Sequence, residues 1–204
     1  MRKHEGFTLL EMLIVIVTLG ILSTTITLSV VRMSSTADAN NIINNMLMLR
    51  HATLVWYKEN LSRMVIDSKG GCKINVNGTE QKLDDFVKNH GEEILRYIDN
   101  RNSLILRPSN IDDKNNTGDY TLQSINDNKQ WYVCYNSGSI DYTEKNYGKE
   151  SPLLDVKKKL AGRVESLRKE GLELKGKDDI TKNPTATYTY NHKFACMLII
   201  DFSK

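Results

Sequence analysis

A single acidic residue, Glu11, stands at the start of a long apolar segment. Residues 12–31 carry no charge, and Arg32 is the next charged residue along the chain. At about 1.5 Å per residue, a helix of this length covers about 30 Å, which is the thickness of a bilayer core. A carboxylate deep in such a span costs roughly 2.5–3.5 kcal/mol on insertion scales. The position of Glu11 therefore requires a specific role.

The six residues that precede Phe7 form a short basic leader. Arg2 and Lys3 would hold this end of the chain on the cytoplasmic side of a membrane. A secretory signal is usually cut after its apolar region. Here the candidate cut comes before that region, between Gly6 and Phe7, so the apolar segment would stay on the mature chain.

The combination of a basic leader, the sequence GFTLLE at residues 6–11 and the uncharged run resembles the class III signal of type IV pilins and pseudopilins. The resemblance is close over residues 2–32 and extends to the rest of the chain only in general layout. It implies that a prepilin peptidase cuts after Gly6 and that the new first residue, Phe7, is N-methylated. It also places Glu11 at the fifth mature position, where this family has a glutamate.

Cleavage would create a charge that complements Glu11. The new α-amino group at Phe7 lies about one helical turn from Glu11, so the amine of one subunit can pair with the carboxylate of a neighbour. A buried charge is tolerable when it is paired and strongly unfavourable when it is not. The sequence thus predicts that Glu11, together with Thr8, forms an assembly site that fixes docking and register.

Three other interpretations of these residues remain open. Thr8 and Glu11 fit a capping box, in which each side chain bonds a free backbone N–H at a helix start, and this is compatible with assembly. The segment can also be an uncleaved signal anchor. A buried helix of a soluble domain fits less well, because an uncharged run of this length is typical of membrane spans.

No set of residues in the sequence predicts catalysis. His51, His90 and His192 are isolated, and the chain has no zinc-protease motif, phosphate loop or nucleophile elbow. The doublet Asp112-Asp113 lacks the regular oxygen-ligand spacing of a calcium loop, and a solvated loop explains it better. We therefore expect no enzyme activity, no cofactor and no metal site.

The three cysteines, Cys72, Cys134 and Cys196, all follow the apolar segment and would lie outside the cytoplasm. Cys134 and Cys196 each lie in an apolar, strand-like run, which makes them candidates for a disulfide between neighbouring strands. The alternative is three small buried side chains without a bond. The sequence leaves the pairing open.

The nearly balanced charge of the chain gives no support to a nucleic-acid partner. The chain has 204 residues, with 28 Lys and Arg against 25 Asp and Glu and a net charge of +3. Such a balance gives no argument for nucleic-acid binding by bulk charge. The length suffices for one globular domain and a long helix.

One long helix is expected to carry the N-terminal segment. It is predicted over residues 7–62, about 80 Å in length, with 7–31 as the membrane span or filament core. Residues at spacings of three and four predict one buried face in its second half. These residues are Ile42, Met46, Leu49, Thr53 and Trp56. A leader over residues 1–6 and a globular head over 63–204 complete the predicted organisation.

The resemblance to type IV pilins implies an α+β head, in which a small antiparallel sheet packs on the second half of the long helix. Helices are predicted over residues 80–100 and 152–171, and Pro152 opens the second of them. The lysines of that basic helix, including Lys157, are expected mainly on its solvated face. Strands are predicted over residues 73–76, 103–107, 120–125, 130–135, 139–143, 185–190 and 193–202. Turns are predicted at Asn77-Gly78 and at 126–129.

The resemblance implies a structural subunit, major or minor, of a type IV pilus that serves adhesion and motility. Its precursor would cross the cytoplasmic membrane once and would later become part of a surface filament. Its partners would be prepilin peptidase, an assembly ATPase with its membrane platform, and other pilin subunits. One alternative is a pseudopilin of a type II-like secretion or DNA-uptake system. Another is a membrane-anchored binding domain that forms no filament.

Overall fold

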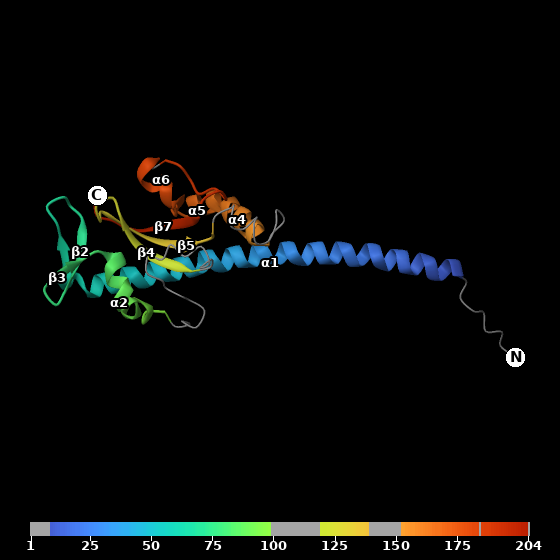
Figure 1. Cartoon of the computed structure of the whole chain (residues 1–204), viewed down its shortest axis with the longest axis horizontal. Coiled ribbons are helices and arrows are strands. Elements are labelled where there is room, and N and C mark those ends of the chain that lie inside the picture. The colour runs from blue at the N-terminus through green and yellow to red at the C-terminus, as the bar shows by residue number, and fades with distance from the viewer. Residues whose placement is uncertain (1–8, 99–118, 139–151, 184, 204) are drawn as a thin grey trace.

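The fold is α+β, with a long N-terminal helix packed on small antiparallel sheets, as predicted (Figure 1). The computed structural model describes residues 9–98, 119–138, 152–183 and 185–203. The leader and the strands predicted over 103–107 and 139–143 lie outside these residues. So does Asp112-Asp113. The domain bounds predicted from the sequence stay predictions.

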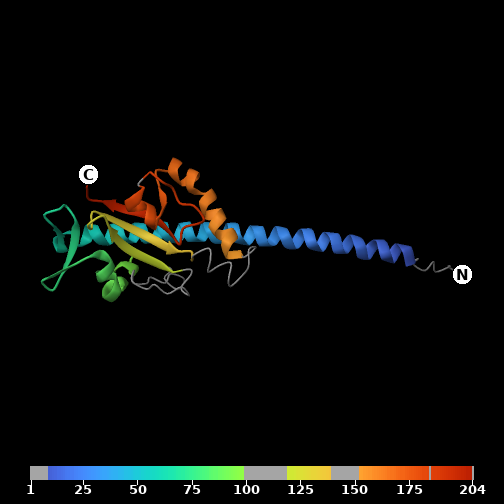
Figure 2. The same cartoon turned by 45° about the horizontal axis from the view of Figure 1, so that its top comes forward.

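Helix α1 spans Leu9–Glu59 and contains 51 residues, which corresponds to about 76 Å. Its N-terminal half projects beyond the head in both views (Figure 1 and Figure 2). The helix ends three residues before the predicted boundary. Asn60 has a φ of −107°, and its side-chain amide donates a hydrogen bond to the carbonyl oxygen of Trp56 at 2.9 Å. The same carbonyl oxygen also accepts the Asn60 backbone N–H at 3.0 Å, so the side chain of Asn60 adds a second hydrogen bond at the end of the helix. A short 3-10 helix, η1, follows at Leu61–Arg63.

The larger sheet packs against the second half of α1. Among the described strands its order is β4-β5-β7-β6, and all pairs are antiparallel. The strands are β4 (Tyr120–Ile125), β5 (Gln130–Asn136), β6 (Leu174–Gly176) and β7 (Phe194–Asp201). The predicted hairpin between β4 and β5 is confirmed. Its turn contains three successive residues with positive φ, which are types that tolerate this conformation: Asn126, Asp127 and Asn128.

The second sheet lies at the end of the head that is farthest from the N-terminus (Figure 1). It contains β1 (Met64–Ile66), β2 (Cys72–Val76) and β3 (Thr79–Gln81) in that order. The predicted turn at Asn77-Gly78 is confirmed, with φ values of 51° and 86°. Positive φ at both central positions is the geometry that a tight hairpin requires.

The helices of the head differ from the prediction in detail. Helix α2 spans Leu83–Leu95 and is broken at His90, whose φ is −130°, directly before Gly91. Pro152 is the first residue of α4 (Pro152–Gly162), as predicted. The single helix predicted over 152–171 is wrong, because the chain breaks after Gly162 and continues as α5 (Val164–Lys169). Glycine lowers helix stability enough to favour such a break.

The C-terminal region contains two short elements that the hydrophobic pattern does not predict, β6 and α6 (Lys177–Lys182). The strand predicted over 185–190 is wrong, since the described part of this segment is irregular. It keeps one strand-like contact, in which the Tyr188 N–H donates to the Leu174 carbonyl at 2.8 Å.

The predicted buried face of α1 is confirmed. All five residues of the stripe are buried, and Met46, Leu49 and Trp56 are among the largest fully buried side chains. Helix α4 also packs on α1, close to the point where α1 leaves the head. The core therefore lies between the second half of α1, the larger sheet, α2 and α4, and it extends to β2.

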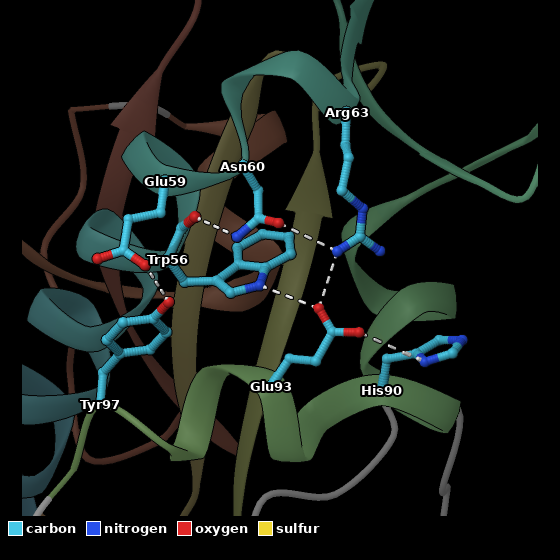
Figure 3. A network of polar contacts seen from close by, with 7 residues as sticks. All are labelled: Trp56, Glu59, Asn60, Arg63, His90, Glu93 and Tyr97. Atoms are coloured by element: carbon cyan, nitrogen blue, oxygen red, sulfur yellow. Dashed lines mark hydrogen bonds and ion pairs between the residues drawn. The ribbon is translucent and has the colours of Figure 1, made fainter.

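A polar network attaches the end of α1 to α2 (Figure 3). The Glu93 carboxylate accepts hydrogen bonds from Arg63 at 2.9 Å and from the Trp56 indole at 3.4 Å. His90 lies 3.7 Å from the second oxygen of the same carboxylate. Phe86 stacks on His90 from the neighbouring turn of α2. These contacts fix the position of α2 against the long helix.

Candidate assembly site

The N-terminal part of α1 is apolar all around. We call residues 9–23 the stalk. Its large apolar side chains have exposed fractions between 44% and 86%. They are Leu9, Leu10, Met12, Leu13, Ile14, Val15, Ile16, Val17, Leu19, Ile21 and Leu22. A helix that is apolar on every side is typical of a buried or membrane-spanning segment. In the isolated chain these side chains do not pack into a hydrophobic core.

The hydroxyl groups of Thr18 and Ser23 in the stalk form hydrogen bonds with backbone carbonyl oxygens of the same helix. The Thr18 hydroxyl lies 2.9 Å from the carbonyl oxygens of Ile14 and Val15, and the Ser23 hydroxyl donates to Leu19 at 2.7 Å. Bonds of this kind need no external partner. The polar side chains of the stalk are thus compatible with apolar surroundings.

Glu11 lies in the first turn of α1 and is exposed. A carboxylate at this end of a helix is favoured by the helix dipole. Gly6, Phe7 and Thr8 lie outside the described residues. The cleavage point, the methylated residue and the pairing of Glu11 with a neighbour's amine therefore stay predictions.

Within the described part of the chain, we find no helix that combines the length and the apolar character needed to cross a membrane. The span predicted over residues 7–31 stays a prediction.

Cys134 and Cys196 are joined by a disulfide. They are directly paired residues of β5 and β7, and both are fully buried. Cys72 is a free, buried cysteine in β2. Burial raises the pKa of its thiol from 9 to about 11, with a further contribution from the Asp67 charge. The Cys72 thiol is therefore uncharged at neutral pH.

Lys157 is the clearest departure from the sequence interpretation. Its side chain is fully buried instead of solvated. The ammonium group donates hydrogen bonds to the carbonyl oxygens of Gly138 and of His192, the latter at 3.0 Å. Burial lowers the pKa of Lys157 from 10.5 to about 8. Lys157 thus attaches α4 to the end of β5 and to the turn before β7.

Two of the three histidines that are isolated in the sequence, His90 and His192, have acidic neighbours in the fold. The His192 ring lies 2.8 Å from Asp179, and His90 lies near Glu93. The Thr189 hydroxyl contacts the other ring nitrogen of His192 at 3.0 Å. Among the described residues, no three His, Cys, Asp or Glu side chains gather closely enough to hold a metal ion.

One comparison with known proteins identifies the N-terminal region. Residues 1–27 match the family model of the prokaryotic N-terminal methylation motif. No curated protein and no solved structure is significantly similar to the chain. The matched region contains the leader, Glu11 and most of the apolar run, and this motif belongs to structural rather than catalytic proteins. Residues 1–27 therefore carry the class III signal peptide of type IV pilins and pseudopilins.

Proposed function

We propose that this protein is a structural subunit of a type IV pilus, assembled through its N-terminal helix into a surface filament. The observation that carries the proposal is the stalk, which exposes apolar side chains on every side while the head has a core of its own. Such a surface needs lipid before assembly and other stalks after it. The methylation motif over residues 1–27 supports the same proposal.

The first step is processing at the membrane. A prepilin peptidase cuts between Gly6 and Phe7, and the new amino terminus is methylated. The subunit then waits in the cytoplasmic membrane with its head on the outer side. Glu11 directs docking when it meets the amine of a neighbouring Phe7, because each charge removes the cost of burying the other.

The second step moves the stalk from lipid into a bundle of stalks. Both environments are dry, so this transfer gains little hydrophobic free energy. Close packing and the pairing of Glu11 then decide the register. A small net gain suits a fibre whose assembly is driven by an ATPase on a membrane platform. The head stays on the outside of the fibre, where it is available for adhesion.

A pseudopilin of a secretion or DNA-uptake system would use the same signal and the same stalk. None of the described residues favours that alternative over a pilus subunit. A membrane-anchored domain that forms no filament would keep residues 1–6, because the peptidase would not act on it.

Mass spectrometry of the N-terminal peptide tests the proposal. Sheared surface material and membranes from the same cells are compared. A methylated peptide that starts at Phe7 in the sheared fraction supports a processed filament subunit. A peptide that starts at Met1 and occurs only in membranes would overturn it, and the anchored domain would take its place.

A further inference from the structure

A cavity opens in the head where β6 stops pairing with β7. The two strands pair from Gly176 to Leu174, whereas β7 continues to Asp201. The chain that leads into β6 diverges from β7 at this point and leaves a space of about 290 Å³. It is lined by Arg50, Arg168, Gly171, Leu172, Glu173 and Leu198. A single water needs about 10–15 Å³, so the cavity has room for more than one water.

Two guanidinium groups line this cavity with most of their donors unused. Arg50 comes from α1, and its Nε donates to the Leu198 carbonyl at 2.9 Å. Among the described residues this is its only hydrogen bond, and the Arg168 side chain from α5 has neither a hydrogen bond nor an ion pair. Two like charges that line one cavity repel each other, and an anion between them would remove that repulsion.

The one carboxylate that lines the cavity does not neutralise the arginines. Glu173 forms an ion pair with Lys175 at 3.0 Å. Asp201 lies in an adjoining cavity of about 180 Å³, where it accepts a hydrogen bond from Gln130 at 2.9 Å. The two guanidinium charges therefore remain as an excess of positive charge in this space.

We propose that Arg50 and Arg168 form a binding site for an oxyanion, that is, a carboxylate or phosphate group. A guanidinium presents its N–H donors in a planar fork that matches both groups, and paired forks favour them over a spherical ion such as chloride. The site is built from three separate parts of the fold: α1, α5 and the edge of β7. It lies in the head and does not depend on filament assembly.

The test is an NMR titration of the full-length chain in a non-ionic detergent. Sodium phosphate or sodium acetate replaces sodium chloride at constant ionic strength, and the backbone amides of Gly171, Leu172 and Leu198 are followed. The site predicts saturable shifts with phosphate or with acetate, and the better ligand identifies which group the cavity prefers. Shifts with neither anion would overturn the proposal.

Matched variants distinguish specific anion binding in the cavity from nonspecific attraction of anions to positive charge. Arg168→Gln should weaken binding by about tenfold or more, because a hydrogen bond to a charged group is lost. Arg168→Lys keeps the charge but loses the fork, and it should also weaken binding. Lys158→Gln removes the same charge from an exposed position on α4 and should leave the affinity unchanged. Equal weakening in Arg168→Gln and Lys158→Gln would overturn the proposal. Arg168 is exposed, so its variants are expected to fold.

Discussion

Replacement of Lys157 by methionine should change how stability depends on pH. In the folded chain, burial lowers the pKa of Lys157 from 10.5 to about 8. Between these two values the folded lysine is neutral while the unfolded lysine still holds its proton. Stability rises with pH wherever the unfolded state binds more protons. The contribution of Lys157 is therefore unfavourable at neutral pH and disappears as the pH approaches 10.5.

The size of the effect follows from the shift. Each pKa unit corresponds to about 1.4 kcal/mol, so the wild type should gain about 2–3 kcal/mol between pH 7 and pH 10 relative to Lys157→Met. The variant also loses the donor to the carbonyls of Gly138 and His192. That loss costs roughly 1–3 kcal/mol and is largely independent of pH. The prediction therefore concerns the change with pH and not the stability difference at one pH.

Urea unfolding of both full-length proteins in non-ionic detergent, near pH 7 and near pH 10, measures this change. Cys72 and the buried tyrosines also titrate at alkaline pH, but they are present in both proteins and cancel in the difference. Lys158→Met removes one charge from an exposed neighbour and reports the effect of net charge alone. If the difference between wild type and Lys157→Met is the same at both pH values, the burial of Lys157 does not perturb its titration and the reasoning fails.

Three further predictions concern the disulfide, the network of α1 and α2, and the assembly site. The double variant Cys134→Ala and Cys196→Ala should lower the free energy of unfolding by about 4 kcal/mol, because the disulfide closes a loop of 62 residues. If reduction of the wild-type disulfide left its urea unfolding curve unchanged, this prediction would be contradicted. Glu93→Gln removes the ion pair with Arg63 (Figure 3) and should lower the free energy of unfolding by about 1 kcal/mol in the same assay. A variant more stable than the wild type would argue against a stabilising role of the network. Glu11→Ala should leave cleavage intact but reduce the yield of sheared filaments. Glu5→Ala should not reduce that yield, because the proposed cleavage would remove residue 5. Normal incorporation of Glu11→Ala into filaments would refute its docking role.

The elements with strong local signals were predictable from the sequence. The spacing of Ile42, Met46 and Trp56 determines the buried face of α1, because a helix has to bury its apolar stripe. Asn77-Gly78 and residues 126–128 predict tight turns, since these residue types tolerate positive φ. The N-terminal signal was equally readable, because its leader, glutamate and uncharged run are all local features.

The missed features depend on contacts between distant parts of the chain. Strand β6 has three residues and α6 has six, which is too short for a periodic pattern to stand out. The burial of Lys157 depends on acceptors near residues 138 and 192, and no spacing within α4 reveals them. The pairing of Cys134 with Cys196 likewise requires the register of β5 against β7. The two arginines of the cavity are 118 residues apart in sequence.

The continuity of α1 has a consequence for the orientation of the head. Because one unbroken helix runs from the stalk into the core, the rotational phase of the stalk is transmitted directly to the head. A slip of one residue in the packing of stalks would move a head by about 1.5 Å along the helix axis and turn it by about 100°. The contact that fixes stalk register would thereby also select which face of the head, α2 or α4 and α5, is turned outward.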